Sequence, residues 1–144
     1  MSWLSRILNL RAESADVPSP TQVIGQIGEN AAKAYLAAKG MRFLMANFRG
    51  RRGEIDLVFR DTESIVFVEV KSRKLSSWTR PSAAVSKHQK RLTSKTALEY
   101  LRLCNNPEVT LRFDIVEVLT IEDEIVEVRH LVDAFPLASP YRYG

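Results

Sequence analysis

The sequence has one cysteine and two histidines, and this scarcity excludes several kinds of site. The lone Cys104 cannot build a disulfide framework or a cysteine-based zinc site. No apolar run approaches the roughly 20 residues of a membrane-spanning helix, and the N-terminus lacks a continuous apolar segment with a small-residue cleavage site. We therefore expect a cytoplasmic protein that does not span a membrane.

Length and composition fit one globular domain. A chain of 144 residues can bury a core without disulfides or metals, and 45% apolar with 26% charged residues is ordinary for a soluble protein. Pro18 and Pro20 separate the N-terminal segment from the rest of the chain. We predict a flexible tail over 1–20, a domain over 21–135 and a C-terminal tail over 136–144. Alternatively, Trp3 and Leu10 bracket a short amphipathic segment that docks on a partner or in a homodimer.

The net charge of +4 is unevenly distributed. Residues 70–98 contain eight Lys or Arg and no Asp or Glu, whereas residues 108–133 contain eight acidic residues against Arg112 and Arg129. Arg49, Arg51 and Arg52 form a second basic cluster. Such segregation favours one positive face for a polyanion partner, with two solvated charged surfaces as the alternative.

Periodicity and turn residues predict a mixed α/β fold. Apolar residues recur at helical spacing after Thr21, a candidate N-cap, until Gly40. Strands are expected over 41–48, 54–60 and 65–71, then a helix over 82–103 capped by Ser82, then strands over 109–119 and 125–132. The predicted order is α-β-β-β-α-β-β, a mixed central sheet of about five strands flanked by helices.

Two neighbouring strands carry charged residues where core residues would be expected. Because strand side chains alternate with period two, Glu54 and Asp56 share a face, and so do Glu69 and Lys71. The same alternation predicts that the apolar residues of the strand over 54–60 share the face opposite to Glu54 and Asp56; these are Ile55, Leu57 and Phe59.

A four-residue loop over 61–64 would fix the register of this hairpin. It pairs Arg60 with Ile65, Asp56 with Glu69 and Glu54 with Lys71. Two carboxylates about 5 Å apart repel by roughly 3 kcal/mol at an effective dielectric near 20. A divalent cation between them reverses the interaction, so the pattern favours a metal site over a solvent-facing hairpin with cross-strand ion pairs.

The segments GEIDLV and FVEVKSR resemble the YraN family of uncharacterised bacterial proteins, which is placed in the PD-(D/E)XK nuclease superfamily. The superfamily also holds archaeal Holliday-junction resolvases and restriction endonucleases. The likeness extends from Val23 to Phe135 and includes Asn47-Phe48-Arg49 and Arg112-Phe113-Asp114. It implies a restriction endonuclease-like core. The proline that gives the superfamily its name is replaced by Ile55.

The resemblance also implies a catalytic set. Asp56 and Glu69 would ligate Mg²⁺ or Mn²⁺, and the Val70 carbonyl would add a third oxygen. Lys71 would position or activate the attacking water, and Glu29 would approach from the first helix. The expected activity is phosphodiester hydrolysis in nucleic acid, with DNA favoured and branched or junction-like DNA a candidate. A nucleic-acid-binding module that keeps the fold but cuts little or nothing is the alternative.

Several residues are expected to contact nucleic acid. Either Lys87 or Gln89, in the second helix, would meet a phosphate according to the resemblance, and the sequence does not choose between them. The basic clusters supply the other candidates, which are Arg49, Arg51, Arg52, Arg73 and Lys74.

Overall fold

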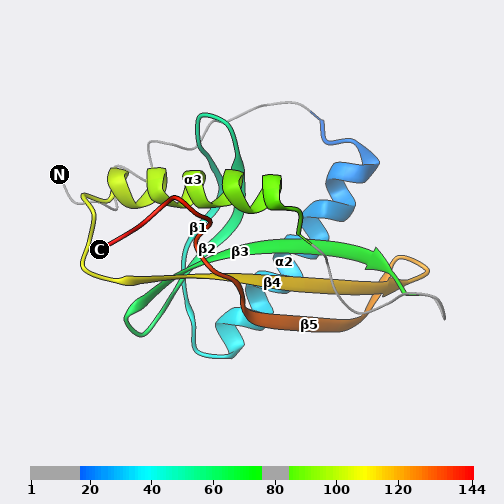
Figure 1. Cartoon of the computed structure of the whole chain (residues 1–144). Coiled ribbons are helices and arrows are strands. Elements are labelled where there is room, and N and C mark those ends of the chain that lie inside the picture. Colours follow the sequence, from blue (N-terminus) through cyan, green and yellow to red (C-terminus); the bar gives the residue numbers. More distant parts are fainter. Residues whose placement is uncertain (1–16, 76–84) are drawn as a thin grey trace.

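The computed structural model describes residues 17–75 and 85–144, which form a mixed sheet between two helices (Figure 1). The elements are, in order, α2 (Pro20–Ala38), β1 (Arg42–Arg49), β2 (Glu54–Asp61), β3 (Ser64–Lys74), α3 (Lys87–Leu103), β4 (Thr110–Ile121) and β5 (Glu124–Phe135). The predicted α/β class and the order α-β-β-β-α-β-β are confirmed. The segment around Trp3 and Leu10 lies outside the described residues, and so does Arg80, one of the eight basic residues of the segment 70–98.

The five strands lie across the sheet in sequence order. Neighbouring strands are antiparallel except β3 and β4, which are parallel. Parallel neighbours require a crossover connection, and the segment that contains α3 supplies it. As a result α3 packs on one face of the sheet and α2 on the other (Figure 1).

The core has one cluster on each face of the sheet. Under α3, the Tyr100 ring lies 5.2 Å from that of Phe48 and 5.6 Å from that of Phe67. Under α2, two helix residues pack against β3 and β4; the set is Ala32, Leu36, Val66, Val68, Val116 and Val118. Residues 65–68 of β3 are buried on both faces, which explains the continuous apolar run at this point of the sequence.

Both predicted helix starts are wrong. The N-cap of α2 is Ser19, not Thr21, because Ser19 and Gln22 exchange reciprocal hydrogen bonds of 3.2 and 2.7 Å. The N-cap of α3 is Ser86, whereas the predicted cap Ser82 lies outside the described residues. None of the described helices has the length and apolarity of a membrane span.

The predicted alternation along β2 fails in its first half. Leu57 and Phe59 pack under α2, but Ile55 packs under α3. The cause lies in β1, where Asn47 has a left-handed φ of 54° and the flanking pairs place it opposite Asp56. Both strands change face there, so a strict period of two cannot describe them. Asp56 therefore lies where β2 reverses the direction of its side chains.

Candidate active site

The ladder between β2 and β3 ends where the charged residues begin. Its last pair is Leu57 with Val68, in the predicted register. The loop has two residues, Thr62 and Glu63, instead of the predicted four, because Asp61 and Ser64 already pair. The shorter loop leaves the register unchanged.

Beyond this pair, a side chain of β2 accepts a hydrogen bond from the backbone of β3. Oδ2 of Asp56 accepts a hydrogen bond of 2.8 Å from the backbone N–H of Val70. No ion pair joins Glu54 to Lys71 in the described part of the chain, and Glu54 instead lies 3.9 Å from Arg49. The Asp56 carboxylate is thus fixed in the wedge between the two strands, and the ladder contains neither the predicted pair of Asp56 with Glu69 nor that of Glu54 with Lys71.

The Glu69 carboxylate is held by α3. Nε2 of Gln89 donates to Oε1 of Glu69 at 2.5 Å. Oε2 of Glu69 is buried and has no hydrogen-bond partner in the described structure. An unpaired buried carboxylate oxygen is costly, about 1–3 kcal/mol or more. This oxygen therefore identifies a position where a cation or a hydrogen-bond donor would be stabilising.

Burial and neighbouring carboxylates act together on Asp56. Its pKa is raised to about 7, first by burial, and further by the negative charges of Glu29, Glu69 and Glu54. The hydrogen bond from Val70 opposes this rise. Four carboxyl groups therefore share one region, and its electrostatics favour a positive ligand.

Glu29 enters the site through a close helix–strand contact. The preceding residue, Gly28, is buried, and a Cβ at this position would lie 2.1 Å from Oγ of Ser72 in β3. With its amide nitrogen turned toward Glu29, Asn47 donates to both carboxylate oxygens at 3.2 and 3.3 Å. The pKa of Glu29 is raised, mainly by burial, against the lowering effect of Asn47 and with a further rise from Glu54. Sequence reasoning included Asn47 in the family resemblance but gave it no role at the site, although asparagine is a residue type that tolerates this left-handed conformation.

A pocket of about 210 Å³, which we call the carboxylate pocket, opens beside these groups. Its walls come from β2, β3 and the first turns of α3, and they include Asp56, Glu69 and Gln89. In the part of the chain that the structure describes, no three His, Cys, Asp or Glu side chains converge as a ready-made metal cage. The side chains therefore offer at most two ligands to one ion, which fits a cation that keeps water or phosphate oxygens.

Lys71 lies two residues after Glu69 and is half-buried. Within residues 17–75 and 85–144 its ammonium group forms no ion pair. Its neighbour in the parallel register of β4 is Glu117, which is 1% exposed. Sequence reasoning missed Glu117, because its burial depends on elements that pack around β4.

The other predicted contact residues are dispersed. Arg51 and Arg52 are exposed in the β1–β2 turn, whereas Arg73 lies 3.8 Å from Glu117. Gln89 contacts Glu69, while Lys87 is exposed at the start of α3, so the structure gives these two alternatives different surroundings. The remaining two candidates, Arg49 and Lys74, are both exposed.

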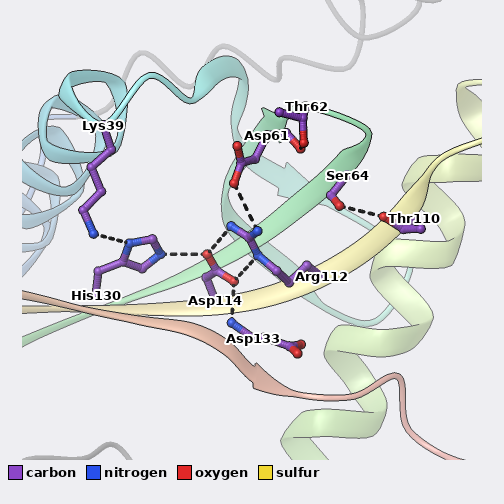
Figure 2. Close-up of polar contacts among 9 residues, drawn as sticks. All are labelled: Lys39, Asp61, Thr62, Ser64, Thr110, Arg112, Asp114, His130 and Asp133. Atoms are coloured by element: carbon purple, nitrogen blue, oxygen red, sulfur yellow. Dashed lines mark hydrogen bonds and ion pairs between the residues drawn. The ribbon is translucent and has the colours of Figure 1, made fainter.

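Arg112 and Asp114 of the third segment of the likeness form a polar network (Figure 2), in which Asp114 is buried, and neither residue lines the pocket. Arg112 donates to both oxygens of Asp114 at 2.9 and 3.0 Å, and its Nη1 lies 3.1 Å from Asp61. Asp114 also contacts Nε2 of His130 at 2.7 Å and accepts from the backbone N–H of Asp133 at 2.9 Å. The network joins the β2–β3 turn to β4 and β5, so its role is structural.

The chain is thus a mixed α/β protein with an acidic pocket where two central strands separate. It belongs to the uncharacterised protein family UPF0102, whose model matches residues 28–118. A UPF0102 protein of Geobacter sulfurreducens is 37% identical over 117 residues, which cover 81% of this chain and 91% of the relative. One from Syntrophus aciditrophicus is 41% identical over 79% of this chain and 89% of the relative. One from Coxiella burnetii is 38% identical over 80% and 96%. The resemblance to the YraN family is confirmed by these matches.

Proposed function

We propose that this protein hydrolyses phosphodiester bonds in nucleic acid with the help of a divalent cation, Mg²⁺ or Mn²⁺. One observation carries the proposal: Asp56 and Glu69 each have one oxygen fixed by a hydrogen bond and one oxygen left over. The leftover oxygen of Glu69 is buried. Two carboxylates oriented in this way are suited to a hard cation, and the resemblance to restriction endonucleases and junction resolvases favours DNA as the substrate.

The residues present fit a cation of this kind. Asp56 and Glu69 would hold it, with the Val70 carbonyl as the third oxygen, and water or phosphate would complete the set. The raised pKa of Asp56 supports this assignment, because a nearby positive charge would relieve its repulsion with Glu29 and Glu69. When bound, such a cation lowers the pKa of the attacking water and neutralises charge that develops on the phosphate.

The side chains contribute three actions. Gln89 fixes the Glu69 carboxylate, so that only Oε2 faces the ligand. Lys71 places a positive charge on the same strand, where it would bind a phosphate oxygen or orient the attacking water. The Asn47 amide holds Glu29 where its charge acts on Asp56, and a carboxylate with a raised pKa can accept a proton from water.

The test is cleavage of a labelled panel that comprises single-stranded, duplex, tailed and four-way-junction DNA and the matching RNAs. We expect cleavage that requires Mg²⁺ or Mn²⁺ and stops with EDTA. Asp56→Ala, Glu69→Ala and Lys71→Ala should each abolish it. Asp123→Asn, an exposed acid in the β4–β5 turn, is the matched control.

Two results would contradict the proposal. Equal residual cleavage in all three pocket variants would indicate a contaminating nuclease or another site. Tight binding without cleavage under any metal condition would favour the nucleic-acid-binding module instead.

A further inference from the structure

A second hollow, of about 410 Å³, lies between the β1–β2 turn, one side of α3 and the C-terminal segment. We call it the basic cleft. Four basic side chains line it together with one acid and one aromatic ring, namely Arg51, Arg52, Lys95, Arg102, Glu99 and Tyr141. The cleft is separate from the carboxylate pocket, because the two hollows share no lining residue.

The charges of the basic cleft are not neutralised internally. Its four cations and one carboxylate give a formal charge of 4 − 1 = +3. In the described part of the chain, none of the four basic groups forms an ion pair. Oε2 of Glu99 instead accepts a hydrogen bond of 3.0 Å from the backbone N–H of Arg51. A concave surface with this excess of positive charge attracts anions.

The turn that carries Arg51 and Arg52 is fixed against α3. The backbone N–H of Gly50 donates to the Gly53 carbonyl at 2.8 Å, which closes the turn. A Cβ at Gly53 would lie 2.6 Å from Oγ1 of Thr96, so this glycine permits close contact with the helix. The two arginines therefore project from an anchored base, which lowers the entropy lost on binding a ligand.

The C-terminal segment places an aromatic ring at the opposite wall. This segment returns along α3, where the backbone N–H of Ala138 donates to Oγ of Ser94 at 2.9 Å (Figure 1). The backbone N–H of Tyr141 donates to the Ala138 carbonyl at 2.9 Å, and the Tyr143 hydroxyl donates to the Pro107 carbonyl. The Lys95 ammonium lies 5.9 Å from the Tyr141 ring centroid. A half-buried ring beside cations is the combination that binds single-stranded nucleic acid.

The basic cleft and the carboxylate pocket lie along the same helix. The pocket uses residues 89, 92 and 93 of α3, and the cleft uses residues 95–102. At 1.5 Å per residue their centres are about 10 Å apart along α3. A single strand whose bases stay stacked advances about 3.4 Å per phosphate, as it does in duplex DNA, so this separation corresponds to about three nucleotides.

We propose that the basic cleft binds an unpaired segment of the nucleic-acid strand, about three nucleotides from the reacting phosphate, with Tyr141 stacked on a base. This inference rests on the proposed function and narrows its substrate class to tailed or branched nucleic acid. The bases must be unpaired, because the faces of paired bases are already covered by their neighbours in the duplex. Phosphate contacts alone would explain the cations but not the aromatic ring among them.

Fluorescence anisotropy of the full chain in EDTA tests the cleft without cleavage. The labelled probes are a 12-nucleotide single strand, a blunt duplex and the same duplex with a single-stranded tail. Tyr141→Ala should weaken single-strand and tailed-duplex binding by about 5- to 150-fold and leave blunt-duplex binding unchanged, whereas Tyr141→Phe should bind like the parent. Lys95→Gln combined with Arg102→Gln should reduce the slope of log affinity against log salt by about 1.4 for the single strand.

The matched control removes two charges elsewhere. Arg42 and Arg60 are exposed cross-strand neighbours at the far end of the β1–β2 ladder, so Arg42→Gln with Arg60→Gln makes the same change in net charge. Parent-like affinity of the Tyr141→Ala protein for the tailed duplex would overturn the inference, and so would equal losses for blunt and tailed duplexes. Cleavage measured in Mg²⁺ separates the two proposals. If the parent cleaves and the cleft variants bind nucleic acid as the parent does, only the cleft proposal is refuted. If the cleft variants lose binding and the parent does not cleave, only the nuclease proposal is refuted.

Discussion

Replacing Asp56 by asparagine removes one charge from the carboxylate pocket and keeps the shape of the side chain. Burial and three neighbouring carboxylates raise the pKa of Asp56 to about 7 from 3.8. In the unfolded chain the group ionises near the lower value, so the native state holds the proton more tightly. Between these two pH values stability falls as the pH rises, and above about pH 7 the full cost of the ionised carboxylate is present.

The raised pKa of Asp56 sets the size of the expected change in the free energy of unfolding. A difference of about 3 pKa units corresponds to about 4 kcal/mol at 1.36 kcal/mol per unit. Without metal, the Asp56→Asn protein should therefore be more stable than the parent at pH 8, by up to about this amount. The difference should shrink through pH 6 and vanish near pH 4. The asparagine oxygen can still accept the hydrogen bond from Val70.

Urea unfolding in EDTA between pH 4 and pH 8 measures this difference. Asp123→Asn is the control, because Asp123 is an exposed carboxylate whose left-handed φ of 63° suits asparagine equally well. Mg²⁺ at 100 times its Kd should stabilise the parent by about 2.7 kcal/mol and should not stabilise the Asp56→Asn protein. A metal-free Asp56→Asn protein that is less stable than the parent at pH 8 would refute the reasoning. It would show that the charged carboxylate stabilises the fold as an acceptor or ion-pair partner.

Three further predictions concern the scaffold. Asp114→Ala should destabilise the fold by about 3–5 kcal/mol in urea unfolding, because it leaves the Arg112 guanidinium partly buried without its main partner; a loss below 1 kcal/mol would contradict this. Gly28→Val should cost about 1–3 kcal/mol and lower cleavage, because its side chain would push α2 away from Ser72; unchanged activity would show that the contact does not position the helix. Phe67→Ala should cost about 3–5 kcal/mol, because the ring is 1% exposed in the core; a thermal melt close to that of the parent would show that the site collapses.

The sequence was sufficient for the order of the elements and for the hairpin register as far as Leu57 and Val68, but the ladder ends before the predicted pair of Asp56 with Glu69. Turn residues separate the strands clearly, and the apolar run over 65–68 matches a strand that is buried on both faces. The predicted loop is two residues too long, but the predicted pairing of Arg60 with Ile65 is confirmed, because both loop lengths give the same register. Charges at core-like strand positions were enough to select Asp56, Glu69 and Lys71 as candidates.

The remaining features depend on distant contacts. The left-handed Asn47 reverses the faces of β1 and β2, and no period-two pattern contains that information. Gln89 reaches Glu69 only because α3 crosses the sheet, and Tyr141 meets Lys95 only because the C-terminal segment returns along the same helix. The Ser19 cap was missed because Thr21 is also a capping residue type, and the reciprocal bonds of Ser19 with Gln22 are seen only in the structure.

The crossover between β3 and β4 also sets an order of assembly. Asp56 and Val70 are 14 residues apart and meet within a local hairpin, whereas Glu69 and Gln89 are 20 residues apart and Ser64 and Thr110 are 46 apart. Local contacts form faster than distant ones, because they close shorter loops. We therefore expect Asp56 and Glu69 to come together during folding before the helix that holds Glu69 is in place. A divalent cation in the refolding buffer should speed the formation of this hairpin, because it can bind both carboxylates.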